Sequence, residues 1–156
     1  MSITVGVDSY IDVAGADEYF NNRLYTDAWA NATETDKEKA LKQATRKIDM
    51  MPLKGIPVST DQPLAFPRAY FAPSQPESER RFNLPPGWWA MEDVPDAVKW
   101  AVCEEALAML EYGNSKRLKL QAQGVKNVSF GDMSEAYGPN NPYGFLSLDA
   151  YRLMKQ

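Results

Sequence analysis

The sequence has no histidine and only one cysteine, and these shortages exclude most of the chemistry by which enzymes are recognised. Histidine is the commonest general base and metal ligand in proteins. The single cysteine, Cys103, is followed by two glutamates instead of the basic neighbour that would activate a thiol as a nucleophile. It also rules out an internal disulfide and fits a reducing compartment. We therefore expect no enzyme activity, no catalytic residue, no bound metal and no cofactor.

Long apolar runs are missing as well. No segment approaches the apolar length that a membrane span needs, and the first residues are not a basic stretch followed by an apolar block. We therefore expect no membrane partner and a protein made in the cytoplasm of its cell. The 156 residues, of which 44% are hydrophobic, suffice for one domain with a true core, so we expect a single domain over residues 1–156.

Clustered positive charge is scarce, and the formal net charge is -4. Nucleic-acid binding through phosphates needs clustered lysine and arginine. One basic cluster stands out, at residues 116–119, with Lys126 nearby. The overall acidity argues against tight binding of duplex DNA, and it is compatible with a surface along which DNA passes without being held.

What the sequence does contain is helical periodicity. Asp12 is placed to cap a first helix, and Thr35, with Glu38 three residues later, predicts a capping box for a second. Ser147 is placed to cap a short helix near the C-terminal end. Spacings of three and four predict that the buried faces of these helices carry Val13, Ala16, Tyr19, Phe20, Leu24, Ala40, Leu41, Ala44, Ile48, Met51, Leu148, Tyr151 and Met154.

The longest helix is predicted after Asp93, a suitable cap, with Pro95 in its first turn. It is expected to run to Tyr112, where Gly113 and Asn114 predict a left-handed stop. The apolar stripe of this helix is unusually wide, which predicts burial on two sides and a central position in the fold.

Three residues of this helix carry specific expectations. Trp100 is expected to widen the buried face. Glu104 and Glu105 are expected to face solvent or a neighbouring subunit, because carboxylates are seldom fully buried.

The middle of the chain is irregular, since residues 52–94 hold eight of the eleven prolines. Their aromatic content is too high for a free tether, so we predict an ordered loop with one or two short helical turns or edge strands. Strands at 116–122 and 125–130 are predicted to form a hairpin. The predicted fold class is mainly α: a small helical bundle around a long central helix, with a β-hairpin and a long ordered proline-rich loop.

The sharpest motif of this middle segment is residues 64–68. Pro67 restrains Phe66 to an extended conformation, which directs Phe66 into the core and presents Arg68. Two interpretations of Arg68 stay open, an intramolecular salt bridge on the surface or a contact with a neighbouring subunit. The pair Trp88-Trp89 allows base stacking, but the acidic residues that follow it favour packing in the core or at a protein interface.

The order of these elements resembles that of the head–tail connector, or adaptor, proteins of tailed bacteriophages, some of which carry a DnaT-like single-stranded-DNA-binding label. The resemblance covers most of the chain and lies in four segments, residues 13–20, 40–49, 64–68 and 94–101. Phe66 stands where many relatives have tryptophan, and residues 70–93 look longer than is usual in the family.

The resemblance implies a structural virion protein that is made in the host bacterial cytoplasm and located in the neck between capsid portal and tail. The implied partners are further copies of the chain in a dodecameric ring, the phage portal protein, and a tail terminator or stopper protein. Such a ring extends the DNA channel, and genomic DNA passes through its lumen without specific binding.

Site residues follow from the same resemblance by position. The C-terminal arm, about residues 143–156, would bind the portal through Phe145, Leu148, Tyr151 and Leu153. The subunit interface would include Phe66, Arg68, Trp88 and Trp89. The hairpin would present Arg117, Lys119 and Lys126 to the lumen or to the next ring.

The alternative function is a single-stranded-DNA-binding replication accessory protein of the DnaT-like type. The two functions differ in the surface that they need. A protein of the second kind should show a basic groove with aromatic side chains inside it.

Overall fold

The structure is a computed structural model that describes residues 2–73, 84–113, 127–130, 133–136 and 146–155. These residues form five helices and two small antiparallel sheets, so the prediction of a mainly α fold is confirmed. The helices are α1 (Val13–Asn21), α2 (Asp27–Ala30), α3 (Glu34–Asp49), α4 (Asp96–Tyr112) and α6 (Leu148–Met154). The strands are β1 (Ile56–Pro57), β2 (Arg68–Phe71), β3 (Trp88–Ala90), β4 (Asn127–Phe130) and β5 (Met133–Ala136).

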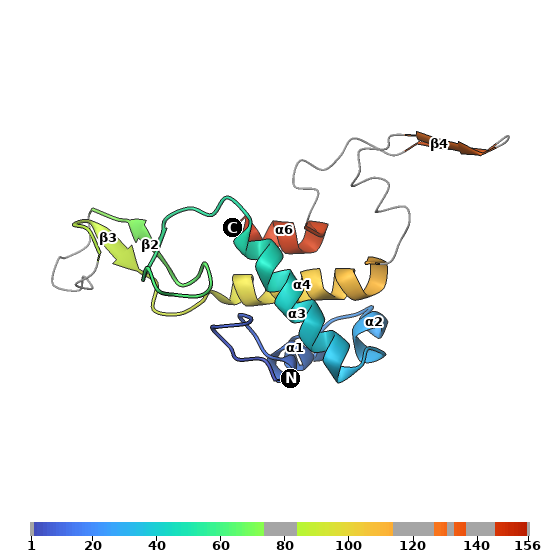
Figure 1. Cartoon of the computed structure of the whole chain (residues 1–156), viewed down its shortest axis with the longest axis horizontal. Coiled ribbons are helices and arrows are strands. Elements are labelled where there is room, and N and C mark those ends of the chain that lie inside the picture. Colours follow the sequence, from blue (N-terminus) through green and yellow to red (C-terminus); the bar gives the residue numbers. More distant parts are fainter. Residues whose placement is uncertain (1, 74–83, 114–126, 131–132, 137–145, 156) are drawn as a thin grey trace.

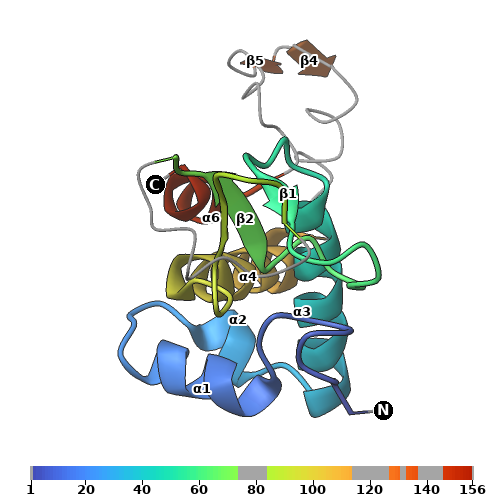
Figure 2. The same ribbon diagram turned by 90° about the vertical axis from the view of Figure 1, so that its left-hand side faces the viewer.

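Helix α4 packs against α1, α2, α3 and α6. Figure 1 shows α6 on one side of α4 and α1 with α2 on the other, while α3 crosses it. The view in Figure 2 places the N-terminal segment between α1 and α3. The core between these elements is apolar, and its members include Phe20, Trp29, Leu41, Ile48 and Val102. In the part of the chain that the structure describes, no helix is both long and apolar enough to cross a membrane.

The helix ends agree with the sequence at some positions and differ at others. Asp12 and Ser147 cap α1 and α6 as predicted, the Asp12 carboxylate accepting a 2.8 Å bond from the Gly15 N–H. The cap of α3 is Thr33 instead of Thr35. Both threonines precede an acidic residue by three positions, so the capping pattern alone cannot choose between them.

The two ends of α4 also correct the prediction. Its N-cap residue is Pro95, with no side-chain cap bond, so Asp93 does not serve as the cap. Gly113 at the other end has φ -58°, which is right-handed, so the predicted left-handed stop is wrong at this residue.

The proline-rich middle contains a three-stranded antiparallel sheet in the order β1-β2-β3. The sequence predicts short helical turns or edge strands in this segment, and the structure has three short strands. Trp88 and Trp89 lie on β3, paired with Phe71 and Tyr70 of β2. The second sheet pairs β4 with β5, and β4 falls within the predicted 125–130 strand. The predicted 116–122 strand lies outside the described residues. Arg117, Lys119, Lys126 and Phe145 lie outside the described residues.

Glu104 and Glu105 are buried, with 5% and 2% of their surface exposed, so the prediction that they face outward is wrong. Glu104 accepts a 2.6 Å bond from the Tyr19 hydroxyl and a 2.7 Å bond from Arg23, both of which belong to or follow α1. Burial and the bond to Glu104 raise the pKa of Tyr19, which therefore remains a proton donor at neutral pH.

Glu105 makes the corresponding contacts on the other side of α4. It accepts a 2.6 Å bond from Lys47 of α3 and a 2.6 Å bond from the Ser147 N–H, at the start of α6. Buried carboxylates are stable only when they are paired or hydrogen-bonded. Two adjacent residues of α4 thus tie three other helices to it.

Phe66 lies in the core as predicted, with its ring edge-on to Tyr10 at a centroid distance of 5.8 Å. Arg68, by contrast, is not at the surface, since only 8% of it is exposed. Its guanidinium donates to the carbonyl oxygens of Lys54 at 2.7 Å and Gly55 at 2.6 Å, and more weakly to those of Leu53 and Ala65. The side chain is engaged by backbone carbonyl oxygens of its own chain, in place of a surface ion pair.

The Arg68 contacts lead to a stability prediction. We expect Arg68→Lys to lower the free energy of unfolding by about 2–3 kcal/mol, because an ammonium cannot reproduce the planar fork that reaches two carbonyls at once. Urea denaturation measures the change. Arg152→Lys is the matched control, since Arg152 is an exposed arginine with one 3.8 Å contact, and we expect a change within about 0.5 kcal/mol. Equal effects of the two substitutions would contradict a structural role for Arg68.

Candidate nucleic-acid interface

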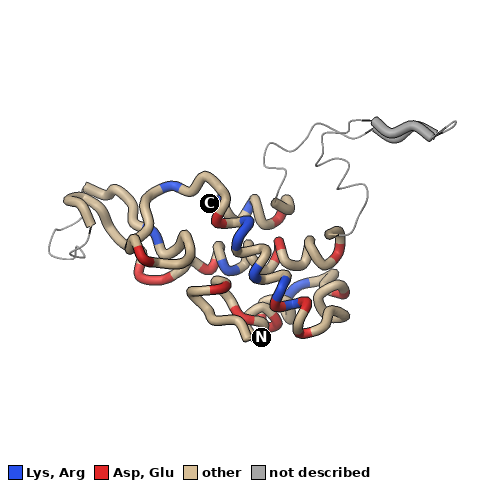
Figure 3. The backbone as a smooth tube through the Cα atoms, in the orientation of Figure 1, with Lys and Arg blue, Asp and Glu red and all other residues tan. Residues whose placement is uncertain are grey.

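Helix α3 has an apolar inner side and a charged outer side. Ala40, Leu41, Ala44, Thr45 and Ile48 are buried on the inner side. The exposed residues Lys39, Gln43, Arg46 and Met50 follow one another at spacings of four, three and four, which places them in one stripe along the helix. Figure 3 shows lysine and arginine recurring along the length of α3.

Two of the lysines on this helix are part of the scaffold. Lys37 forms a 3.0 Å ion pair with Asp17, and its ammonium lies 5.0 Å from the centre of the Trp29 ring. Lys47 neutralises the buried Glu105. A ligand could engage these two lysines only by uncovering groups that the fold has buried, so we exclude both from the candidate site.

The remaining three cations are available to a ligand. Lys39, which is exposed, pairs with Asp36 at 3.2 Å, and Lys42, which is half-buried, pairs with Asp8 at 3.5 Å. Arg46 has no ion pair with any residue in the described part of the chain. Surface ion pairs contribute little to stability, so a phosphate can replace the carboxylate at small cost. We call Lys39, Lys42 and Arg46 the basic face of α3.

The two carboxylates beside the basic face are charged at neutral pH. A hydrogen bond from the Thr4 N–H, together with nearby Lys42, lowers the pKa of Asp8. Hydrogen bonds from Thr33 and Lys39 lower the pKa of Asp36. The cations of the basic face are therefore accompanied by charged carboxylates, and Arg46 alone among the three forms no ion pair within the described residues.

Lys54 extends this basic region beyond the end of α3. Its side chain is exposed and has no ion pair among the residues that the structure describes. Its backbone is held in place because the Arg68 guanidinium bonds its carbonyl oxygen. The motif at residues 64–68 therefore influences where a cation is presented, although Arg68 itself never reaches the surface.

The arrangement offers contacts to phosphate. Burial, with the nearby charge of Glu104, raises the pKa of the Cys103 thiol to about 12, so this thiol is not a nucleophile at neutral pH. Within the described ranges no three His, Cys, Asp or Glu side chains come together in a way that could hold a metal ion.

Among the described residues, the predicted sites fall in two places, the helix α6 and the paired strands β2 and β3 with the loop before them. Leu148 of α6 is exposed, while Tyr151 and Leu153 are half-buried against the core. Trp88 and Trp89 are half-buried on β3, and Phe66 and Arg68 are buried.

The basic face of α3 was not among the predicted sites. The sequence contains its signal, because lysine at 39, lysine at 42 and arginine at 46 are spaced to share one side of a helix. The contiguous run at 116–119 was easier to see. Cations separated by three and four positions become a cluster only when the chain winds into a helix.

Comparison with known families gives one match. A family described as "Putative DnaT-like ssDNA binding protein" matches residues 2–144, which is most of the chain. No curated protein and no solved structure matches the chain.

This match corrects the prediction of a head–tail connector. The description of the matching family names single-stranded-DNA binding, and nothing in the comparisons indicates a connector family. The connector resemblance depended on the order and spacing of short segments, none of which is specific by itself. The neck location, the ring, the portal and stopper partners, and the portal-binding role of residues 143–156 were implied by that resemblance alone.

The division between scaffold and site on α3 can be tested with two adjacent residues. We expect Lys47→Met to lower the free energy of unfolding by about 3 kcal/mol, because it leaves Glu105 buried without its cation. This value is at the low end of the range for buried pairs, since Lys47 is 38% exposed. We expect Arg46→Met to change it by less than about 0.5 kcal/mol. Thermal and urea unfolding measure both, and a larger loss for Arg46→Met would place Arg46 in the scaffold.

Proposed function

We propose that this chain, which belongs to the family described as DnaT-like ssDNA-binding proteins, binds single-stranded DNA through the basic face of α3. Lys39, Lys42 and Arg46 would contact successive phosphates, and Lys54 would extend the contact beyond the helix. The observation that carries the proposal is the row of cations on one side of α3, in which Lys39 and Arg46 are exposed and Arg46 forms no ion pair among the described residues.

The surface favours a particular mode of binding. A single-stranded-DNA-binding protein was expected to show a basic groove with aromatic residues inside it. The basic face is instead the convex side of a helix, and the exposed side chain at its end is Met50. We therefore propose binding that is dominated by phosphate contacts, weak and independent of sequence.

Single strands suit this face better than duplex DNA for two reasons. One row of cations can follow one phosphate backbone, and a flexible strand can adapt to the curvature of the helix. The lower charge density of a single strand also reduces repulsion from a protein whose net charge is -4.

In this proposal α4, which the sequence predicts to be the central helix, holds α3 in place. The Lys47–Glu105 pair joins α3 to α4 from the inner side of α3. It holds the helix in the orientation that turns Lys39, Lys42 and Arg46 outward.

The number of available cations predicts the salt dependence. If Arg46 and Lys54 alone neutralise phosphates, the slope of log K against log salt is about -1.4, and if all four cations do so it is about -2.8. Titration of a labelled oligothymidylate by fluorescence anisotropy, repeated over a series of salt concentrations, measures this slope. Absence of binding to the oligonucleotide at low salt by a folded sample would refute the proposed function.

The location of the interface is tested by two variants with the same change in net charge. We expect Lys39→Gln, Lys42→Gln and Arg46→Gln together to weaken binding about tenfold or more. We expect the salt slope to become shallower by about 0.7 if Arg46 alone of the three neutralises a phosphate, and by about 2.1 if all three do. The control combines Lys99→Gln, Arg152→Gln and Lys155→Gln, which lie on α4 or at α6, and we expect it to retain most of the affinity. An equal loss in both would show that the strand senses only the overall charge, and would reject α3 as the interface.

A further inference from the structure

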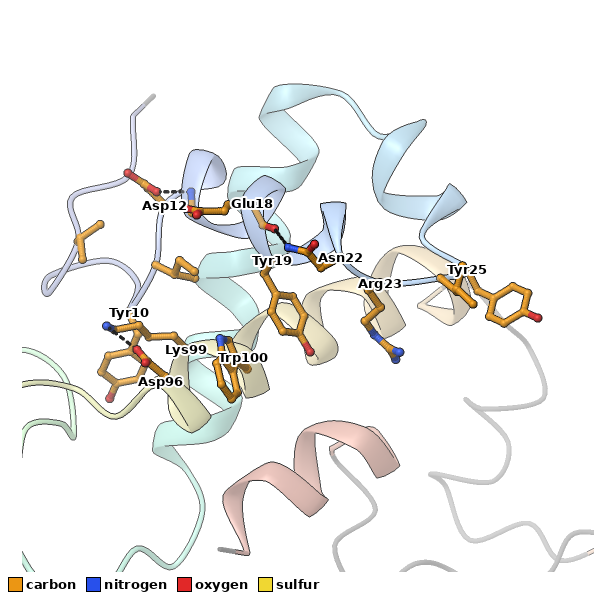
Figure 4. Close-up of a pocket in the computed structure, with 14 residues that line it drawn as sticks. Tyr10, Asp12, Glu18, Tyr19, Asn22, Arg23, Tyr25, Asp96, Lys99 and Trp100 are labelled. Carbon is orange, nitrogen blue, oxygen red and sulfur yellow. Dashed lines mark hydrogen bonds and ion pairs between the residues drawn. The ribbon is translucent and has the colours of Figure 1, made fainter.

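A second surface feature is a groove of about 1080 Å³ between the N-terminal segment, α1 and the beginning of α4. Figure 4 shows the rings of Tyr19 and Trp100 beside each other in this groove, and their centroids are 6.1 Å apart with planes 23° from parallel. Trp100 remains 43% exposed, so it does not widen the buried face of α4 as predicted. Four of the nine large hydrophobic side chains that are exposed in the described structure line the groove, Val5, Leu24, Tyr25 and Trp100. Such a concentration of exposed apolar surface is typical of an interaction site.

The groove contains cations, but these cations are already paired with carboxylates of the protein. Arg23 is bonded to the buried Glu104 and lies 3.6 Å from Asp149. Lys99 is paired with Asp96 at 3.1 Å. The positive charge in the groove is therefore committed to contacts within the protein.

The charge left over in the groove is negative. Glu18 lines it, and no hydrogen bond or ion pair of the Glu18 carboxylate is found among the described residues. Asp12 uses one carboxylate oxygen to cap α1 and keeps the other. A groove with a paired set of cations and a free carboxylate attracts a cation and repels a phosphate.

Tyr25 marks the open end of the groove. It is 87% exposed and has φ +61°, a left-handed conformation that is rare for a bulky residue. Figure 4 shows its ring directed away from the protein body. Burial in the core does not account for this residue, and strained exposed residues of this kind are enriched at ligand-binding sites.

We infer that this groove binds a protein segment in which arginine alternates with apolar side chains. The guanidinium would stack on the exposed indole of Trp100 and pair with a groove carboxylate, Glu18 first. Apolar side chains of the segment would cover Val5, Leu24 and Tyr25. The occupant is a protein segment rather than a second stretch of DNA, because the free charge of the groove is negative. This inference goes beyond DNA binding and does not depend on the basic face of α3.

The test uses the full chain and a fluorescein-labelled hexapeptide in which arginine and leucine alternate. We expect saturable binding by fluorescence anisotropy, and a loss of at least fivefold on Glu18→Lys. The matched control is Glu111→Lys, the same charge change at the far end of α4, with affinity within twofold of the parent protein. We expect a peptide with glutamate in place of arginine not to bind.

Tyr25→Asn is the second variant, because asparagine tolerates the left-handed conformation and the fold should be unaffected. We expect it to weaken the arginine peptide at least threefold, with an unchanged urea midpoint. The inference is overturned if the arginine peptide does not bind, or if Glu18→Lys and Tyr25→Asn leave its affinity unchanged. It is also overturned if a labelled oligothymidylate competes the peptide from the groove and binds more tightly to the Glu18→Lys variant, which would make the groove a nucleic-acid site.

Discussion

Two adjacent buried carboxylates on one helix are the constraint on which the rest of this structure depends. Glu104 and Glu105 leave α4 in different directions, and neither can stay buried without a cation or hydrogen-bond donors from another element. Glu104 is satisfied by Tyr19 and Arg23, whereas Glu105 is satisfied by Lys47 and by the first turn of α6. The positions of α1, α3 and α6 around α4 are therefore coupled through one dipeptide.

This coupling also determines which cations are bound within the protein and which remain available to a ligand. The buried glutamates take up Arg23 and Lys47, and Asp17 takes up Lys37 beside Trp29. In the part of the chain that the structure describes, three of the remaining cations lie together on the outer side of α3, while the groove beside α1 keeps exposed aromatic rings and a free carboxylate. Basic and aromatic surfaces that a single-stranded-DNA groove would combine are thus separated onto different sides of α3 and α4. The proposed contacts with phosphate and with a cationic protein segment therefore lie on different surfaces.

Much of the local structure could be predicted from the sequence, and the candidate site could be predicted only in part. Caps at Asp12 and Ser147 and the apolar side of α3 are correct, because both depend on residues within a few positions of one another. The connector prediction is wrong because it relied on the order of short segments, which unrelated functions can share. That the basic residues of α3 share one side of the helix could be predicted from their spacing of three and four positions. The spacing could not show whether a given lysine on that helix is free or is bound to a buried carboxylate. For Lys47, the carboxylate lies 58 positions away in the sequence.

The sequence by itself determined the mainly α character of the chain, the starts of two helices, the burial of Phe66 and the absence of histidine chemistry. Each of these depends on local spacing or on composition. Only the tertiary structure decided that Glu104, Glu105 and Arg68 turn inward, that Trp100 remains exposed, and which cations are left for a ligand. The physical reason is that a charged side chain is buried or exposed according to the partners that distant segments bring to it, and a linear pattern carries no record of those partners.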